Sequence, residues 1–337
     1  SSDVCSSDLR GVAMKLGISS YSLNKRLRTE EMSLFDVIDW AKEHDCAHLE
    51  LVPFSLPLLK EDGTVDYDYV KRVRDHAEKV GMPLSAFSLN ACVIKPTADE
   101  RKRELDRIRM YMDMAHFLGI KKMRHDTCSG QHPNGINTPE QFEKDFPVFV
   151  DAVCELADYA ATLGMSTTLE NHGLYVNGAD RMVRLLNAVD RPNVGMTLDV
   201  GNFLCVDDRP EVAVAKCIKY ADMIHLKDFY IRKKDRMLPQ DGMYTAGAKP
   251  AKPYVMPTPE EFRKMPPSLG YVGTASGLNI LRGSILGQGD MDIWAILKTV
   301  KDAGYDKEVS IEFEGMEDCV AATDICLKTA RYIWDRV

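Results

Sequence analysis

The sequence predicts a (β/α)8 barrel, the TIM-barrel fold, with a long insertion between strand 7 and helix 7. Short apolar or β-branched segments alternate with longer segments of helical periodicity along the chain, a pattern typical of parallel strands joined by crossover helices. Eight such short segments occur, and a barrel of 337 residues is commonly one domain. We therefore expect a single barrel domain over residues 14–337.

The expected strands are short and are separated by segments long enough to hold a helix. In chain order they are KLGISSY (15–21), AHLELV (47–52), LSAFSL (84–89), KKMRH (121–125), STTLEN (166–171), VGMTLD (194–199), DMIHLKD (222–228) and EVSIEFE (308–314). In such a barrel the active site lies at the carboxyl ends of the strands. The last residues of these segments are therefore the first place to look for function.

Helix boundaries are marked between the strands. Thr97 and Glu100 form a T-x-x-E capping box, and Thr138 precedes Pro139 with Gln141 placed to complete a second box. Glycines at 119, 164 and 304 follow the three helical segments expected at 97–119, 138–164 and 291–304. These signals predict helices after the third, fourth and seventh strands.

Two segments fall outside the regular alternation. Residues 1–13 are rich in Ser and Asp and are expected to be a disordered or non-native tail. Residues 231–281 are rich in Pro, Gly and charge and lack a clear helical or strand period, so we expect a lid, a binding loop or a subunit contact. The glycines of 281–292 also offer backbone amides to a phosphate.

Composition restricts the partners. The net charge of -8 argues against nucleic acid, because binding a phosphate backbone depends on Lys and Arg. No segment approaches the roughly 18 apolar residues of a membrane span. Nine cysteines without a CxxC pair favour a reducing compartment, hence a cytoplasmic protein. A small polar substrate is expected, and a homo-oligomer remains open.

Four consecutive expected strands end in residues that bind metals. Glu170, Asp199, His225 and Glu312 come from strands 5 to 8, and each of the first two intervals spans one βα unit. Any one of them alone is more often a helix cap, an ion-pair partner or a core histidine. Three carboxylates and an imidazole at one barrel mouth would repel or be desolvated without a cation. We expect one divalent ion, with Mn(II) or Mg(II) favoured and Co(II) or Zn(II) open.

Neighbouring residues of the same parity extend this site, because side chains two apart on a strand share a face. His172 follows Glu170 in this way and is expected to act as an acid or base or to bind a substrate oxygen. Lys227 follows His225 and is expected to stabilise a developing oxyanion, or instead to form an ion pair with Asp228 or another carboxylate. Glu170 is expected both to bind the metal and to handle a proton, because a carboxylate has two oxygens.

Glu314 lies two residues after Glu312 and so shares its face of the strand, which makes it an alternative metal ligand to Glu312. Further polar side chains near strand ends are expected to contact the substrate, although His125 is as readily a buried or surface histidine. These residues are Asn90, His125, Asn202 and Asp228, with Glu50 and the RHD segment of 124–126 also placed to line the mouth.

The stretches LENHG, TLDVGN, IHLKD and SIEFEG, in this order, resemble the xylose isomerase-like barrel superfamily and its sugar phosphate isomerase/epimerase group. The resemblance implies one divalent metal held by Glu170, Asp199, His225 and Glu312, with a sugar-like substrate chelating it. In the epimerases of this group, the two glutamates at these positions also move the proton. Endonuclease IV and many ketose 3-epimerases carry a histidine where this chain has Asn202, which argues against DNA repair and weakens a ketose 3-epimerase assignment.

The chemistry of such a site favours an isomerase or epimerase acting on a sugar or sugar-like ketone. A divalent ion bridging a carbonyl and its neighbouring hydroxyl stabilises an enediolate, and a nearby base can then remove the carbon-bound proton. The alternative is a lyase that expels a β-substituent from a keto-sugar, keto-glycoside or keto-inositol. A non-catalytic sugar-binding barrel would not need the four ligand residues.

Overall fold

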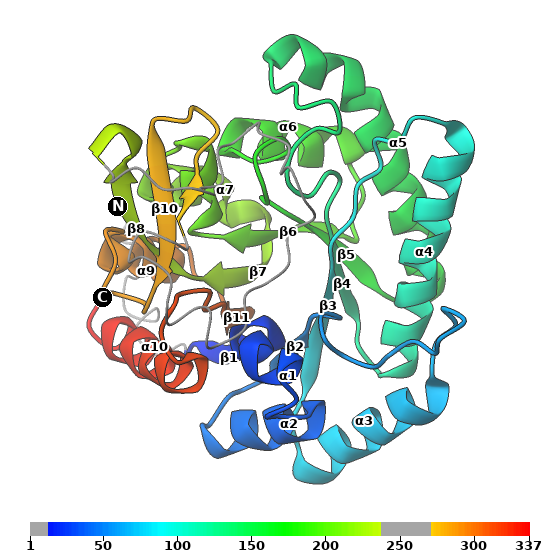
Figure 1. Ribbon diagram of the computed structural model, residues 1–337, viewed down its shortest axis with the longest axis vertical. Helices are drawn as coiled ribbons and strands as arrows, with labels where there is room; N and C mark the ends of the chain where they lie inside the picture. Colours follow the sequence, from blue (N-terminus) through cyan, green and yellow to red (C-terminus); the bar gives the residue numbers. More distant parts are fainter. Residues whose placement is uncertain (1–12, 237–270) are drawn as a thin grey trace, which may run out of the picture.

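Eight parallel strands close into a barrel in the computed structural model, which describes residues 13–236 and 271–337 (Figure 1). The strands are β1 (Lys15–Ser19), β2 (Leu49–Leu51), β3 (Leu84–Leu89), β4 (Lys122–His125), β5 (Ser166–Glu170), β6 (Val194–Asp199), β7 (Ala221–Leu226) and β11 (Glu308–Ile311). Each predicted strand segment overlaps one of them, and their order around the barrel is β1-β11-β7-β6-β5-β4-β3-β2. The predicted (β/α)8 barrel is confirmed.

Helices surround the barrel on its outer side (Figure 1). They are α1 (Asn24–Arg28), α2 (Leu34–Glu43), α3 (Tyr67–Val80), α4 (Ala98–Phe117), α5 (Pro139–Thr162), α6 (Ala179–Val189), α7 (Pro210–Cys217), α9 (Ile293–Asp302) and α10 (Cys319–Trp334). Each barrel strand is followed by at least one of these helices before the next barrel strand begins. Their apolar faces pack on the strands to form the core between the two layers.

The predicted start of α4 is confirmed in full. The Thr97 hydroxyl accepts from the amide of Glu100, and the Glu100 carboxylate accepts from the amide of Thr97. Thr138 caps α5 in the same way, but the side chain of Gln141 donates to Asp145 instead of returning to the cap. The second predicted capping box was therefore wrong, because a carboxylate one turn further along the helix offers a better acceptor to an amide group.

The barrel interior is polar toward the carboxyl ends of the strands. Strand register pairs Glu170 with Thr197 and Asp199 with His225, so these side chains share the inward face. One layer below, the hydroxyls of Thr168 and Thr197 lie 2.7 Å apart. The inward-facing acids of β5 and β6 are thus stacked on hydroxyl groups instead of on apolar side chains.

Residues 231–281, the predicted insertion, follow β7 and precede α9 in the chain. The described ends of this insertion are not irregular: β8 (Asp228–Lys233), β9 (Val272–Gly273) and β10 (Asn279–Ser284) form an antiparallel sheet in the order β8-β10-β9. The expectation that 231–281 lacks strands was wrong at both ends, because the pairing partner of each segment is far away in sequence. Residues 237–270, which make up most of the expected lid at 231–281, and residues 1–12 of the expected tail at 1–13 lie outside the described residues.

Within the described ranges, every helix is too short or too polar to cross a membrane.

Candidate metal centre

Four side chains from neighbouring barrel strands meet at the carboxyl-terminal end of the barrel. Glu170 ends β5, Asp199 ends β6, His225 lies in β7 and Glu312 follows β11. One ligand-type atom from each residue lies within 4.8 Å of every other one. Adjacent parallel strands with inward-facing ends bring about this convergence, as the sequence spacing indicated.

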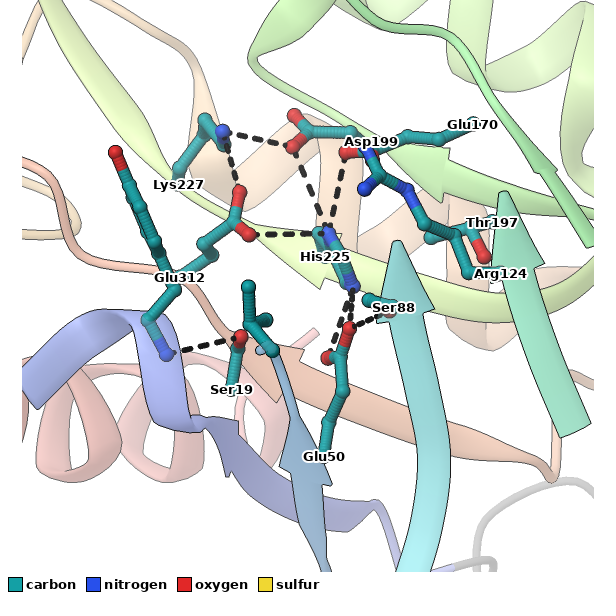
Figure 2. Close-up of polar contacts among 12 residues, drawn as sticks. Ser19, Glu50, Ser88, Arg124, Glu170, Thr197, Asp199, His225, Lys227 and Glu312 are labelled. Atoms are coloured by element: carbon teal, nitrogen blue, oxygen red, sulfur yellow. Dashed lines mark hydrogen bonds and ion pairs between the residues drawn. The ribbon is translucent and has the colours of Figure 1, made fainter. Parts of the chain in front are cut away.

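The imidazole of His225 lies at the centre of the group (Figure 2). Its Nδ1 atom is 3.3 Å from Oε1 of Glu170, 3.8 Å from Oδ2 of Asp199 and 3.7 Å from Oε1 of Glu312. His225 is 1% exposed and Asp199 is fully buried. Three acidic oxygens therefore face one ring nitrogen in a space from which water is largely excluded.

This donor set fits a divalent cation. In the described part of the chain, Nδ1 of His225 is buried and has no hydrogen-bond partner. In the described ion pairs of the mouth, six carboxylates face the side chains of Arg124, Lys227, His172 and His225. The six are Glu50, Asp126, Glu170, Asp199, Glu312 and Glu314. A bound cation would relieve this excess of buried negative charge, and a set of oxygen and imidazole donors can bind a divalent metal ion.

Glu50 orients the imidazole from the opposite side. Both of its carboxylate oxygens lie 3.0 Å from Nε2 of His225, and one of them accepts a hydrogen bond from Ser88. Burial disfavours ionised Glu50, but the charge and hydrogen bond of His225 outweigh burial and lower the pKa of Glu50 to about 2. Such a carboxylate behind a histidine fixes which ring nitrogen is free to bind a metal.

The same carboxylates act on His225 itself. Burial alone would lower the pKa of the imidazole, but the surrounding acids outweigh burial and raise it to about 10. The centre of the site thus strongly favours positive charge.

Lys227 reaches the same acids from the end of β7. Its Nζ atom lies 2.5 Å from Oε2 of Glu312, 3.0 Å from Oδ2 of Asp199 and 3.7 Å from Oε1 of Glu314. Burial opposes the charged amine, yet these carboxylates raise the pKa of Lys227 well above its ordinary value. Gly201 makes room for it, because a Cβ at that position would lie 2.4 Å from Cγ of Lys227.

A second polar group lies on the β4 and β5 side of the mouth. The guanidinium of Arg124 forms ion pairs with Oε2 of Glu170 and, at 3.0 Å, with Asp126. Nδ1 of His172 lies 3.1 Å from Oδ2 of Asp126. Burial disfavours ionised Asp126, but Arg124 and His172 outweigh it and lower the pKa of Asp126. Arg124 and Glu170 therefore link this group to the metal-ligand set (Figure 2).

The two predicted asparagines hold charged side chains in place. Oδ1 of Asn90 accepts from Arg124 at 3.1 Å. Asn202 is buried, donates from Nδ2 to Oε1 of Glu170 at 3.2 Å and accepts from Lys227 at 3.3 Å. Both lie at the site, where the sequence placed them, but their described hydrogen bonds go to charged side chains of the protein.

His125 does not reach the mouth. It is paired in register with Leu169 and so faces away from the inward side that carries Arg124 and Glu170. The ring is fully buried, its Nδ1 lies 3.2 Å from the carbonyl oxygen of Asp126, and burial lowers its pKa to about 4. β4 therefore directs Arg124, the neighbour of opposite parity, into the mouth instead of His125.

Asp228 is also directed away from the substrate side. Its carboxylate accepts from the amides of Gly287 and Gly289 at 2.9 Å each and from that of Met291 at 3.3 Å. A Cβ at residue 289 would lie 2.2 Å from Oδ1 of Asp228, so the glycine is required there. These amides are the ones that the sequence offered to a phosphate, and a carboxylate of the protein already occupies them.

Glu312, not Glu314, is the glutamate that faces His225. Oε1 of Glu312 belongs to the four-residue cluster, whereas Glu314 touches the group through Lys227 alone at 3.7 Å. Sequence reasoning placed 124–126 near the mouth and expected His125 to contact the substrate, but it gave no role to Arg124 or Asp126. The signal it lacked was the parity of β4, which directs Arg124 inward and brings Asp126 to His172.

Comparisons with known proteins agree with this architecture. Residues 38–332 match the profile of the family described as xylose isomerase-like TIM barrel. No curated protein matches the sequence.

Several solved structures share the fold. A D-psicose 3-epimerase from Clostridium cellulolyticum H10 has a TM-score of 0.65 at 15% identity, over 95% of this chain and 99% of that chain. A probable 3-DHS dehydratase, AsbF, from Bacillus anthracis has a TM-score of 0.65 at 16% identity, over 96% and 100%. A xylose isomerase-like TIM barrel protein from Mycobacterium smegmatis in complex with magnesium has a TM-score of 0.62 at 15% identity, over 97% and 99%. At these identities the likeness shows the fold alone.

Proposed function

The chain belongs to the xylose isomerase-like TIM barrel family, and on that premise we propose that it is a divalent-metal-dependent isomerase or epimerase of a sugar or sugar-like ketone. One observation carries the proposal: Nδ1 of His225 is buried, unpartnered among the described residues, and within 3.8 Å of oxygens from Glu170, Asp199 and Glu312. A small-molecule substrate is consistent with the D-psicose 3-epimerase among the similar folds.

Glu170, Asp199, His225 and Glu312 would hold the ion, with Mn(II) or Mg(II) favoured. When bound, such an ion supplies the Lewis acidity that makes a proton beside a carbonyl group easier to remove. Glu50 keeps the imidazole oriented through Nε2, and Asn202 holds Glu170 through Oε1.

His172 is the group best placed to move a proton. We assign the ring hydrogen of His172 to Nδ1, which donates it to Oδ2 of Asp126 at 3.1 Å; a guanidinium nitrogen of Arg124 also lies 3.2 Å from this Nδ1 atom. This leaves Nε2 to accept a proton from the substrate carbon, and Asp126 stabilises the imidazolium that forms. The ring is 31% exposed, whereas the acids around it are buried.

Glu170 serves mainly as a ligand in this scheme. Its Oε1 atom faces His225 and Asn202, and its Oε2 atom is paired with Arg124. Because both oxygens are engaged, we assign the first proton transfer to His172 instead of dividing it with Glu170.

Lys227 and Glu312 lie on the other side of His225 from Glu170 and Arg124 (Figure 2). Lys227 can stabilise negative charge that develops on a substrate oxygen. Lys227 and Glu312 form an acid-base pair on the side of the site opposite His172. An isomerase moves a proton between two carbons, and an epimerase moves it between two faces of one carbon, so either reaction requires two such groups.

The test is deuterium exchange. The metal-loaded protein would be incubated in D2O with ketoses, keto-inositols and 3-keto-glycosides, and NMR would follow the hydrogen beside the carbonyl group. We expect exchange with at least one member of the panel, absent in Asp199→Asn. Loss of a β-substituent would instead identify a lyase. No exchange with any compound, at full metal loading, would contradict the proposal.

A further inference from the structure

Two cysteines face each other beside the site and take no part in the proposed chemistry. Cys92 follows β3 and Cys128 follows β4. Their sulfur atoms are 3.3 Å apart. Among the described cysteines, no other two sulfur atoms lie within hydrogen-bonding distance of each other.

The backbone holds this pair in a geometry that suits a disulfide. Residues 92 and 128 form an isolated antiparallel bridge. The bridge is made by the amide of Val93, which donates to Thr127 at 2.8 Å, and the amide of Ser129, which donates to Ala91 at 2.8 Å. The two cysteines are therefore a non-hydrogen-bonded pair, whose Cα atoms are typically about 4.5 Å apart. That spacing lies within the range of about 4.4–6.8 Å found for disulfides.

The two thiols differ in a way that suits stepwise oxidation. Cys92 is partly exposed, whereas Cys128 is 1% exposed. The hydrogen bond with Cys128 lowers the pKa of Cys92 to about 7, against the opposing effect of burial. A reactive, accessible thiol beside a second thiol is the usual arrangement of a redox-sensitive pair.

We propose that Cys92 and Cys128 are a redox modification site, at which a peroxide forms a reversible disulfide that ties the loop after β3 to the loop after β4. The Cys92 thiolate attacks one peroxide oxygen and releases hydroxide, which leaves a sulfenic acid. The thiol of Cys128 then displaces the sulfenic oxygen as water. Two thiols and one hydrogen peroxide thus give one disulfide and two waters.

The disulfide would act on the neighbouring polar group. Asn90 precedes Cys92 by two residues, and Asp126 precedes Cys128 by two. Both contact Arg124, at 3.1 Å and 3.0 Å. A covalent bond between the loops therefore fixes the spacing of the two residues that hold this arginine. This inference goes beyond the proposed function, and its chemistry does not depend on the substrate.

Mass spectrometry tests the site directly. The full-length protein would be exposed to low hydrogen peroxide, quenched, unfolded, alkylated and digested. We expect a cross-linked peptide pair containing Cys92 and Cys128, lighter by two hydrogens than the two thiols and lost on adding dithiothreitol. Cys92→Ser should abolish the cross-link, and Cys128→Ser should leave a sulfenic acid on Cys92 that dimedone traps.

Cys154→Ser is the matched control, because that partly buried thiol contacts the carbonyl oxygen of Val189 instead of another sulfur. It should leave the cross-link unchanged. Amide hydrogen exchange at Val93 and Ser129 should slow in the oxidised protein. Full alkylation of both cysteines after peroxide, or cross-links to other cysteines, would overturn the site, and unchanged exchange would overturn the coupling between the loops.

Discussion

Lys227 forms a 2.5 Å ion pair with Oε2 of Glu312, the residue whose other oxygen faces His225. Nζ of Lys227 also lies 3.0 Å from Oδ2 of Asp199. A cation of the protein is thus bound to two of the four proposed metal ligands. This relationship makes Lys227 both a stabiliser of the acid cluster and a competitor of the ion.

Lys227→Met separates these two effects. Removing the competing ammonium should tighten Mn(II) binding by roughly tenfold, about 1.4 kcal/mol, because Asp199 and Glu312 lose a partner. Activity should fall by about 10²-fold or more if Lys227 stabilises developing charge. Calorimetric titration measures the affinity for Mn(II), and steady-state kinetics measure kcat. Lys216→Met, at an exposed ion pair with Asp180, is the control. Weaker Mn(II) binding in Lys227→Met would contradict the claim that Lys227 competes with the metal ion for Asp199 and Glu312.

His172→Ala should lower kcat by about 10²-fold or more while leaving metal content unchanged, because the four ligands remain. Asp126→Asn should also lower kcat, since it removes the carboxylate that orients the ring. His116→Ala, at an exposed histidine of α4, is the control variant. Loss of the metal in His172→Ala would make this histidine a ligand, and an unchanged kcat would remove it from the mechanism.

Arg124→Met should destabilise the protein by about 3 kcal/mol in urea unfolding, because it leaves Glu170 and Asp126 buried without their shared cation. The double variant with Asp126→Asn should recover part of this loss, since one uncompensated charge is gone. If the double variant were less stable than Arg124→Met, the ion pair would not be the cause.

Stability at low pH should depend on an ion cluster at the amino-terminal end of the barrel. Lys122 lies 2.9 Å from Glu308 and 3.6 Å from Asp222. Burial disfavours both ionised acids, but Lys122, joined by Lys307 at Asp222, outweighs burial and lowers the pKa of each acid.

A lowered pKa in the folded state gives stability that is present above the unfolded value of about 4 and is lost as the pH falls through the folded value. Lys122→Met should therefore cost about 1–2 kcal/mol at pH 7, a reduced figure because both acids are partly exposed, and much less near pH 3. Thermal unfolding at both pH values measures this. An equal loss at both values would indicate a packing effect instead.

The barrel and the four converging residues could be predicted from the sequence because both follow from local patterns. Alternation of apolar segments sets the strands, and the end of each strand sets which residue enters the mouth. Glu170, Asp199 and His225 needed nothing further, since each lies at or next to the end of a short strand.

What could not be predicted depends on parity and on distant pairing. KKMRH does not reveal whether Arg124 or His125 faces inward, because both residues lie in β4 and only the register with β5 decides. Asp228 follows an inward-facing lysine, yet its acceptor role is set by the amides of Gly287 and Gly289, about sixty residues away. The strands β8 and β10 likewise depend on each other, so neither segment shows a strand period alone.

The most direct test of the account is the metal content of purified protein. Inductively coupled plasma mass spectrometry, after reconstitution with Mn(II) and desalting, should find about one ion per chain in the wild-type protein. Asp199→Asn and His225→Ala should each lose most of it, whereas Glu314→Gln, which changes an acid outside the four-residue cluster, should keep it. Full occupancy in both ligand variants would contradict the proposed centre.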